Sequence, residues 1–408
     1  MKTSLAQFIK DTPEGREANS ILRACVHCGF CTATCPTYQL LGDELDGPRV
    51  RIYLMKEVLE GRQVSAKTQL HLDRCLTCRA CETTCPSGVK YGRLVDIGRS
   101  IVEQRVGRSP LETLKRKALR AAVPDPSLFT ALLKLGRLTR PLLPEGLKRK
   151  VPPASSATLW PEARHARRML VLQGCVQPGI APTINPALAR VLDRIGISLL
   201  AAERAGCCGA VSFHLNAQEE GRDYMRRNID AWWPYIEQGV EAIVMTASGC
   251  GVTVKEYGHL LRHDPRYAEK AERVSALTKD ASEVLSTART ALATRLSPKT
   301  ERQRVAVHSP CTLQHGQQIH GVVESLLAEA GYALTVVPEG HLCCGSAGTY
   351  SILQPALSQQ LLQNKVAALE SDRPEVIATA NIGCLAHIQS GTALPVRHWV
   401  ELLDEALS

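Results

Sequence analysis

The sequence predicts an α+β multidomain chain, in which a mainly helical N-terminal domain is followed by two duplicated α/β domains with small parallel sheets. Three observations support this prediction. All sixteen cysteines belong to two internal repeats, apolar residues near the N-terminus recur at helical spacing, and strand-like runs alternate with helical segments after residue 168. The length of 408 residues also suits several domains.

The first repeat lies in residues 21–100 and follows residues 1–20, which we expect to be a loose leader. Its two copies are 50 residues apart, and each reads C-x2-C-x2-C-x3-C-P. The eight cysteines are Cys25, Cys28, Cys31, Cys35, Cys75, Cys78, Cys81 and Cys85. Between the copies, a Gly47-Pro48 pair begins a segment that ends at Gly61. This segment carries Val50, Leu54 and Val58 at four-residue spacing, which predicts a helix.

The second repeat occupies the C-terminal part of the chain, where we predict one domain over residues 169–300 and another over 301–408. Each copy holds a single cysteine, then Cys-Cys-Gly, then Gly-Cys, and corresponding cysteines are 136 or 134 residues apart. The first copy comprises Cys175, Cys207, Cys208 and Cys250, and the second comprises Cys311, Cys343, Cys344 and Cys384. Since no cysteine is left over, none of the sixteen is expected to be an incidental core residue.

Strands and helices alternate in both copies of this second repeat. The runs MLVL and VAVH precede the first cysteine, ISLLAA and ALTVVP predict second strands, and AIVMTA and VIATA predict third strands. Helices are expected over residues 186–195 and 322–330. This order indicates parallel sheets, whose ligands gather at the carboxyl ends of the strands. The four cysteines of each copy could meet there.

Residues 101–168 form a basic helical linker. They hold fifteen Lys or Arg against five acidic residues, which accounts for the whole net charge of +9. Leu128, Leu132, Leu135 and Leu138 lie on one stripe of a predicted helix. Only Phe129 and Trp160 could stack on bases, so the linker is not expected to bind nucleic acid. An anionic membrane surface, a partner subunit or a merely solvated face remain alternatives.

Several function classes are disfavoured by what the sequence lacks. It has no G-x-G-x-x-G turn and no G-x4-G-K-[ST] loop, so we expect no nucleotide or hydride acceptor on this chain. Lys10 and Asp11 interrupt the region where a signal peptide would need an apolar core, and no apolar run is long enough to span a membrane. We expect a cytoplasmic protein that is not secreted, peripheral on the inner face of the cell membrane.

The motif of the first repeat is the signature of bacterial two-cluster ferredoxins. The resemblance implies two [4Fe–4S] clusters whose ligand sets are interleaved, because the fourth cysteine of each motif ligates the other cluster. Cluster A then takes Cys25, Cys28, Cys31 and Cys85, and cluster B takes Cys75, Cys78, Cys81 and Cys35. Zinc sites would need only four thiolates each and leave the third C-x2-C step unexplained. His27, Arg74 and Arg79 lie beside the motifs and could raise a reduction potential through their charge.

The cysteines of the second repeat leave three alternatives open. A multi-iron cluster offers neighbouring metal corners to an adjacent pair such as Cys207 and Cys208, the pair could instead form a redox-active disulfide, or the thiols could be inert and buried. His308, His315 and His320 near Cys311 could suggest a zinc site, although scattered histidines are more often surface or core residues.

Taken together, the two ferredoxin motifs and two "CCG" domains resemble the iron–sulfur subunits of flavin-linked hydroxyacid and glycerol-phosphate dehydrogenases, and subunits of heterodisulfide reductases. The stretches CVHCGFCTATCPTYQLLGDELDGPRVRIYLMKEVLEG and DRCLTCRACETTCPSGVKYGRL are similar to iron–sulfur subunits of glycolate oxidase, also called glycolate dehydrogenase. The resemblance covers essentially the whole chain. One departure is that heterodisulfide reductase domains usually end in C-x2-C, whereas Ala247 and Asn381 stand at the first of these positions here.

The resemblance implies a subunit that carries electrons and oxidises no substrate by itself. In such complexes two homologous FAD-type subunits oxidise glycolate to glyoxylate, and electrons leave through the iron–sulfur subunit towards a quinone-type acceptor. The corresponding subunit of an anaerobic glycerol-3-phosphate or lactate dehydrogenase is an alternative. A disulfide reductase that acts at one of the adjacent cysteine pairs is another.

Overall fold

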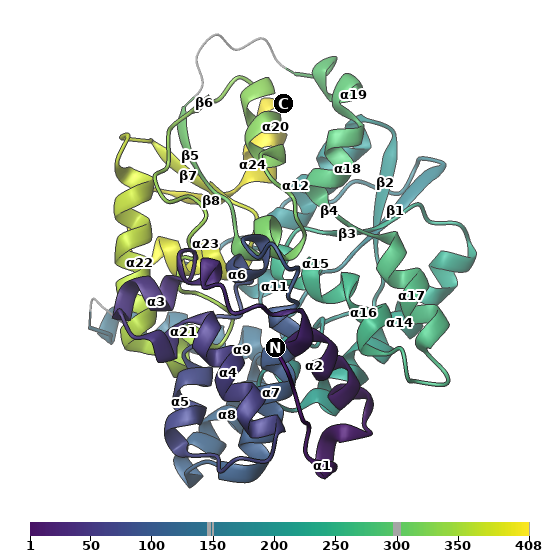
Figure 1. Cartoon of the computed structure of the whole chain (residues 1–408). Coiled ribbons are helices and arrows are strands. Elements are labelled where there is room, and N and C mark those ends of the chain that lie inside the picture. The colour runs from purple at the N-terminus through teal and green to yellow at the C-terminus, as the bar shows by residue number, and fades with distance from the viewer. Residues whose placement is uncertain (145–147, 149–150, 297–302, 408) are drawn as a thin grey trace. The chain divides into compact units, whose positions relative to one another are not determined.

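The computed structural model describes residues 1–144, 148, 151–296 and 303–407. Residues 145–147, 149 and 150 of the basic linker, and the boundary predicted between residues 300 and 301, lie outside the described residues. The chain forms two compact units, which are treated separately below (Figure 1). Unit 1 comprises residues 1–117 and 341–364, and unit 2 comprises residues 118–340 and 365–408. The domain limits given above stay predictions.

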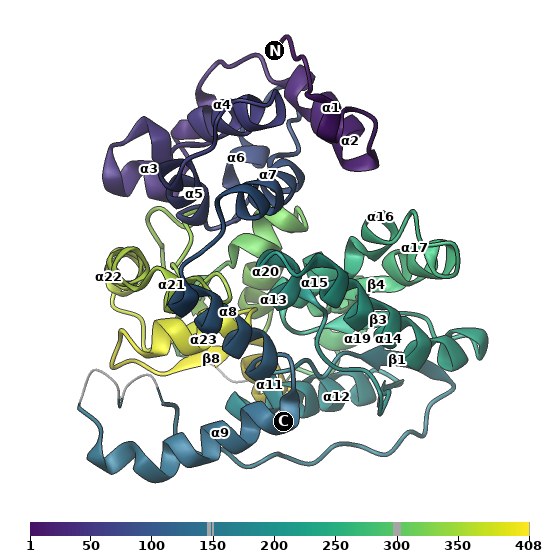
Figure 2. The ribbon, with the colours of Figure 1, turned by 90° about the horizontal axis from the view of Figure 1, so that it is seen from below.

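The described residues of unit 1 form helices only. They are α1 Gln7–Lys10, α2 Pro13–Ala24, η1 Phe30–Thr32, α3 Pro36–Leu41, η2 Glu44–Asp46, α4 Pro48–Leu59, α5 Ala66–Asp73, α6 Ala80–Thr83, α7 Tyr91–Val106, α8 Pro110–Ala122, α21 Tyr350–Leu353 and α22 Pro355–Glu370, of which α8 and α22 end in unit 2. Helices α4, α5, α6 and α7 are grouped together in Figure 2, and α7 packs against the other three. The helical character predicted for this region is confirmed.

Helix α4 is the helix predicted between the two cysteine motifs, and it begins with Pro48 at its first position, where proline loses no hydrogen bond. Its buried face differs from the predicted stripe. Ile52, Met55 and Leu59 are almost fully buried, whereas Val50 and Leu54 are only partly buried. The predicted spacing therefore located the helix but missed the centre of its packed face.

The first twenty residues are not a loose leader, which corrects our expectation. Helix α2 begins where the Thr12 hydroxyl accepts a hydrogen bond from the Gly15 backbone N–H, a typical N-cap. Ile9 and Ala18 are buried, and the N-terminal amine donates to the Cys25 carbonyl at 2.7 Å. The expectation failed because the few apolar residues of this polar segment all fall on one helix face.

Unit 2 contains two four-stranded sheets, and every strand pair in them is parallel. The first sheet has the order β2-β1-β3-β4 and the second has the order β6-β5-β7-β8. The strands are β1 Arg167–Val171, β2 Ile197–Ala201, β3 Ile243–Met245, β4 Thr278–Asp280, β5 Arg304–His308, β6 Ala333–Leu334, β7 Val376–Thr379 and β8 Val396–His398. The two duplicated α/β domains are thus confirmed. Strands β4 and β8 were not predicted, because each is a three-residue strand with a charged residue at its centre.

Helices connect and cover these strands. In unit 2 they are α9 Pro126–Thr139, η3 Arg140–Leu142, α11 Gln177–Ile180, α12 Ile184–Arg194, α13 Ala210–His214, α14 Gln218–Glu237, α15 Ser248–Lys255, α16 Tyr257–Leu260, α17 Ala268–Leu277, α18 Ala281–Thr287, α19 Arg289–Ala293, the π-helical η4 Thr312–Gly316, α20 Val322–Glu329, α23 Ile382–Gln389 and α24 Trp399–Ala406. The helices predicted over residues 186–195 and 322–330 correspond to α12 and α20.

The two α/β domains share one hydrophobic core within unit 2. A single cluster of buried apolar residues includes Leu188 and Val244 of the first domain and Val305 and Trp399 of the second. Polar contacts join the same domains: the Asp404 carboxylate accepts from two arginines of α12, and His398 Nε2 donates to the Thr246 carbonyl at 2.8 Å. The two domains are therefore joined through this shared cluster, while the first domain also has a separate apolar cluster of its own.

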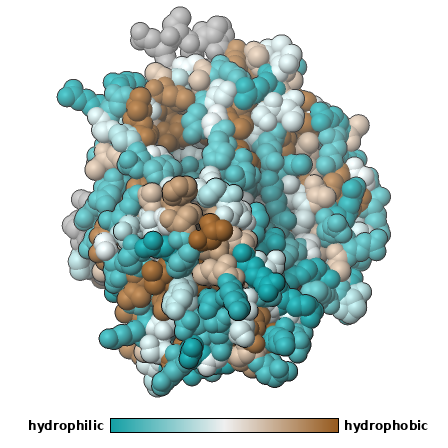
Figure 3. Space-filling view, viewed as in Figure 1, coloured by the Kyte–Doolittle hydropathy of each residue, from teal (hydrophilic) through white to brown (hydrophobic). Residues whose placement is uncertain are grey.

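The surface combines hydrophilic side chains with separate apolar patches, as the face in Figure 3 shows. On α9, the four leucines of the predicted stripe are all exposed, from 43% for Leu128 to 78% for Leu138. The opposite face of α9 packs on α11, which Figure 2 shows in the foreground of unit 2. No helix among the described residues has both the length and the apolar character needed to cross a bilayer.

Candidate metal centres

The backbone of the two ferredoxin-like loops repeats residue by residue. His27 and Gly29 have left-handed backbone angles, with φ of 62° and 89°, and so do Thr77 and Arg79, with φ of 54° and 62°. This conformation turns backbone N–H groups towards the first sulfur of each loop. The Thr77 N–H donates to Cys75 Sγ at 3.4 Å. Three of the four residues are not glycine, and each of these three stores backbone strain of about 1–3 kcal/mol.

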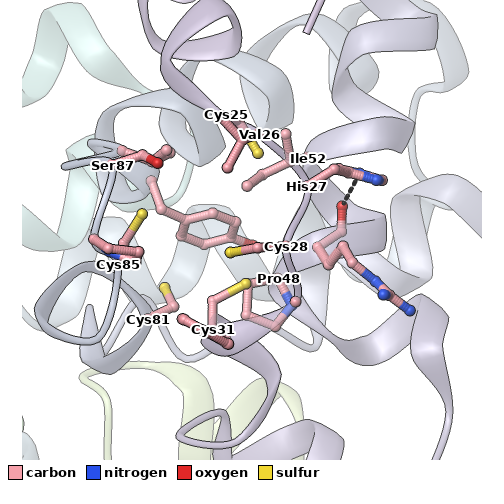
Figure 4. A pocket seen from close by; sticks show the side chains of 16 residues that line it. Cys25, Val26, His27, Cys28, Cys31, Pro48, Ile52, Cys81, Cys85 and Ser87 are labelled. Atoms are coloured by element: carbon pink, nitrogen blue, oxygen red, sulfur yellow. Dashed lines mark hydrogen bonds between the residues drawn. The ribbon is translucent and has the colours of Figure 1, made fainter.

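The first cavity is lined by the four cysteines assigned to cluster A. Figure 4 shows the sulfurs of Cys25, Cys28, Cys31 and Cys85 around one space. The space measures about 440 Å³ and is partly open to solvent. The structure thus brings the last cysteine of the second motif to the first three cysteines of the first motif, as the interleaved assignment expects.

The second cavity is lined by the four cysteines assigned to cluster B. Cys75, Cys78 and Cys81 of the second motif surround a space of about 310 Å³ together with Cys35 of the first motif. Cys81 and Tyr91 line both cavities, so the two spaces are adjacent. The first pocket is lined by five thiols, of which Cys81 is shared, and the second by four. Two neighbouring pockets lined by thiols of interleaved motifs suit two cubane clusters better than a pair of isolated ions.

Positive charge and hydrogen bonds converge on Cys75 beside the second cavity. Burial raises the pKa of the Cys75 thiol, but the charges of Arg51 and Arg99 together with the hydrogen bonds from Thr77 and Tyr91 outweigh it, so the net pKa lies below the usual value. The Tyr91 hydroxyl also donates to Cys75 Sγ at 3.6 Å. This environment favours negative charge on sulfur.

A buried ion network holds these groups in place. Asp46 is fully buried, and its carboxylate accepts from Arg51 at 3.1 Å, from His71 at 3.2 Å and from Arg74 at 2.8 Å. Arg51 also donates to the Thr37 hydroxyl at 3.0 Å. The network therefore ties both cysteine motifs of unit 1 to η2, and removing Asp46 would leave the buried Arg51 without its counter-charge.

The first cavity has fewer compensating groups. Burial raises the pKa of Cys31 to about 11, with the neighbouring Cys25 thiolate as the next cause, and burial likewise raises the pKa of Cys25. Cys28 is exposed. The nearby Arg49 forms an ion pair with Glu44 at 3.0 Å, so its charge is partly neutralised.

In the first CCG domain the four cysteines form a chain of hydrogen-bonded thiols. Cys175 contacts Cys207, Cys207 contacts Cys208, and Cys208 contacts Cys250. The bonds from Cys207 and Cys250 lower the pKa of Cys208 and raise the pKa of the two donors. The four side chains come from the carboxyl ends of β1, β2 and β3, as predicted for a parallel sheet.

The second CCG domain distributes its cysteines between the units. Cys311 and Cys384 belong to unit 2, where the Asn381 side-chain N–H donates to Cys384 Sγ at 3.4 Å. Cys343 and Cys344 belong to unit 1. The Gly345 N–H donates to Cys343 Sγ at 3.4 Å, which repeats the bond from Gly209 to Cys207 in the first domain.

Tyr350 connects this segment to the cluster B loop within unit 1. Its hydroxyl donates to the carbonyl of Arg74, the residue before Cys75, at 3.1 Å. Burial raises the pKa of Tyr350, and the charges of Cys75 and then Cys343 contribute further to the rise. Tyr350 therefore lies near Cys75 of the second ferredoxin motif and Cys343 of the second CCG domain.

His308, at the end of β5, is an unusual buried residue. Its side chain is 2% exposed, and neither ring nitrogen has a hydrogen-bond partner among the residues described. Burial lowers its pKa to about 3, and the charge of Lys365 contributes, so the imidazole is neutral near pH 7. Of the other two histidines noted in the sequence, His315 is buried and His320 is exposed.

The residues that surround the clusters were only partly predicted. Of the three proposed tuning residues, Arg74 is paired with Asp46, and His27 Nε2 donates to the Arg49 carbonyl at 3.2 Å. Arg51, Arg99 and Tyr91 were missed. The repeat held a signal for one of them, because Arg49 stands 50 residues before Arg99.

Comparison with known proteins agrees with this organisation. A family described as "4Fe-4S dicluster domain" matches residues 21–89, and one described as "Cysteine-rich domain" matches residues 169–255 and 305–389. The glycolate oxidase iron-sulfur subunit of Escherichia coli (strain K12) is 56% identical over 100% of this chain and 99% of its own length. The probable glycolate oxidase iron-sulfur subunit of Bacillus subtilis (strain 168) is 31% identical over 96% of this chain and 92% of its own.

A more distant relative covers only part of the chain. The lactate utilization protein A of Bacillus subtilis (strain 168) is 25% identical over 56% of this chain and 96% of its own length. The full-length similarity, the dicluster match and the two cysteine-rich matches agree with the interleaved cysteines and the duplicated sheets. The chain therefore belongs to the family of the glycolate oxidase iron–sulfur subunits.

Proposed function

We propose that this protein is the electron-transfer subunit of a glycolate oxidase complex, and that it accepts electrons from flavin-bearing partner subunits and delivers them to a quinone-type acceptor. The observation that carries the proposal is the pair of adjacent cavities, which are lined by the eight thiols of the two interleaved motifs. Iron–sulfur clusters bound there would supply one-electron redox chemistry. Cys25, Cys28, Cys31 and Cys85 would hold one cluster, and Cys35, Cys75, Cys78 and Cys81 the other.

The residues around the cavities suggest the direction of the path. The first cavity includes the exposed Cys28, so it offers the more accessible entry or exit point. The second cavity lies beside Arg51 and Arg99, whose positive charges stabilise an added electron. Tyr350 then lies between Cys75 and Cys343, which supports an extension of the path to the CCG cysteines.

Partner subunits and a membrane surface are the proposed contacts of this protein. We propose two homologous FAD-type partners, because the chain has no nucleotide-binding motif of its own. For the membrane, we propose that α9 lies on an anionic lipid surface. Its four exposed leucines, together with Lys134, provide the apolar and basic faces that interfacial helices use.

Iron analysis of the anaerobically purified chain is the first test. About eight irons and eight sulfides per chain indicate the two clusters of unit 1, and twelve or sixteen indicate further clusters at the CCG cysteines. Stoichiometric zinc without sulfide would end the electron-transfer proposal.

Turnover of the assembled complex is the second test. Cys28→Ser and Cys78→Ser should each abolish glycolate-dependent quinone reduction, while the flavin subunits still reduce their own flavin. Unchanged quinone reduction in these variants would contradict the proposal. Lactate- or glycerol-3-phosphate-dependent turnover by the co-purified complex, with none on glycolate, would reassign the substrate instead.

The first CCG domain supports a second candidate function, because its four thiols contact one another and the pKa of Cys208 is lowered by hydrogen bonds. A disulfide-reducing site would use such a thiolate as its nucleophile. Reduction of a model disulfide by the isolated chain with a chemical electron donor would favour this function, and Cys208→Ser should then abolish it.

A further inference from the structure

The two CCG domains differ at one pair of positions behind their cysteines. In the second domain, His308 ends β5 and is in parallel register with Thr379 at the end of β7. In the first domain, the residues at the same places in the repeat are Leu172 and Met245. The same point of the sheet is therefore polar in one copy and apolar in the other.

The polar pair is buried without compensation among the described residues. His308 and Thr379 are almost fully buried, and both imidazole nitrogens and the threonine hydroxyl have no hydrogen-bond partner there. A buried polar group without a hydrogen-bond partner destabilises a fold. In the first copy Leu172 and Met245 simply join the apolar core. An apolar pair would thus fit the fold, and the polar pair needs a further partner.

The position of His308 identifies what that partner is. One of its ring nitrogens and Cys384 Sγ lie within 4.8 Å of each other, and Cys311 follows three residues after His308. Two ligands of one metal, with bonds of about 2.1 Å to nitrogen and 2.3 Å to sulfur, lie roughly 3.6 Å apart in tetrahedral geometry. The unpartnered imidazole therefore lies close enough to Cys384 for both side chains to bind one metal.

We propose that His308 is a nitrogen ligand of an iron–sulfur centre in the second CCG domain, whereas the first CCG domain binds its centre through thiolates alone. The inference rests on the proposed function, because it assumes that the CCG cysteines hold redox centres. An imidazole in place of a thiolate removes negative charge and raises the reduction potential of such a centre.

The test is pulsed EPR of the reduced full-length chain in which histidine is labelled with ¹⁵N. The expected result is a nitrogen coupling of the size found for directly bonded histidine. The coupling should vanish in His308→Leu, which copies Leu172 of the first domain. It should persist in His27→Gln, near cluster A, and in His320→Gln, on the surface. If wild-type protein shows no such coupling, or if His308→Leu retains it, the inference is wrong.

A second variant covers the case in which His308→Leu does not fold or does not bind metal. His308→Cys supplies a thiolate at the same place, so the iron and sulfide content should stay at the wild-type level. The nitrogen coupling should be lost and the potential of one centre should fall. An unchanged potential, or one zinc per chain at this site, would overturn the inference.

The two failures can be told apart. If eight irons per chain and glycolate-dependent electron transfer persist without a histidine coupling, only the present inference fails. If the chain binds no iron and does not transfer electrons, the proposed function fails with it.

Discussion

The two cavities of unit 1 arise from the same duplicated motif, yet their surroundings differ. Around the first cavity Cys28 is exposed and Arg49 is paired with Glu44. At the second cavity the repeat counterpart of Arg49 is Arg99, which donates to the carbonyl of Leu72 and to the hydroxyl of Thr77. The comparison teaches that the motif determines where sulfur lies, whereas residues outside the motif determine how much negative charge that sulfur can carry.

The largest expected effect comes from removing the fourth cysteine ligand of each cavity. Cys85→Ala should remove the cluster of the first cavity, although Cys85 belongs to the second motif, and Cys35→Ala should remove the cluster of the second cavity. Each variant should lose about four of eight irons and lower turnover of the complex more than 100-fold. EPR of the remaining cluster distinguishes the two variants. Loss of the opposite cluster in either one would show that the motifs are not interleaved.

The buried network offers the next largest effect. Asp46→Asn removes the carboxylate that accepts from Arg51, His71 and Arg74, and it should destabilise unit 1 by about 3–5 kcal/mol, because the buried Arg51 guanidinium loses its counter-charge. Thermal unfolding of the metal-loaded chain measures this change. Asp11→Asn, at an exposed position of the same unit, is the control and should change stability by less than about 0.5 kcal/mol.

Matched arginine variants sharpen the electrostatic difference. Arg99→Gln should lower the potential of the second cluster by roughly 50–100 mV, because one charge about 8 Å away contributes about 2 kcal/mol at an effective dielectric constant of 20. Arg49→Gln, at the repeat-related position, should have a smaller effect on the first cluster, since Arg49 is only partly buried and is paired with Glu44. Redox titration followed by EPR reports both potentials. Equal shifts in the two variants would show that surroundings do not distinguish the clusters.

A single hydroxyl provides the smallest effect. Tyr91→Phe deletes the hydrogen bond to Cys75 Sγ and should lower the potential of the second cluster by roughly 20–60 mV, the equivalent of about 0.5–1.5 kcal/mol. The repeat-related residue is Leu41, so the first motif has no counterpart to delete. Tyr53→Phe, at an exposed tyrosine of α4, should leave both potentials unchanged. A similar shift in that control would point to a general change in packing.

Local patterns in the sequence were sufficient for much of this architecture. The cysteine offsets predicted the duplicated domains, and the runs before Cys175 and Cys311 predicted the central strands β1 and β5. The resemblance to ferredoxins predicted that Cys85 would lie beside the first three cysteines of the first motif. What escaped prediction depends on tertiary contacts. Asp46 and Arg51 look like ordinary surface charges in the sequence, and only packing by α5 and α7 buries them.

The left-handed loop residues illustrate the same limit. Gly29 is compatible with a positive φ by its residue type, but its repeat counterpart is Arg79, which gives no such indication. The buried face of α4 likewise depends on which neighbour covers it. Patterns of spacing therefore located the cysteines and helices, whereas the charges that act on the cysteines became visible only in three dimensions.

The shared core of the two CCG domains constrains how this protein can have evolved. Once Asp404 and His398 of the second copy satisfied groups of the first, neither copy could be lost or exchanged for a homologous domain in one step. Loss of either copy would expose the apolar surface of the other. Loss of the second copy would also remove the Asp404 carboxylate from the arginines of α12. The copies could still diverge at positions that face away from the shared core. A duplication that began as redundancy thus became permanent, and its two halves were left to specialise.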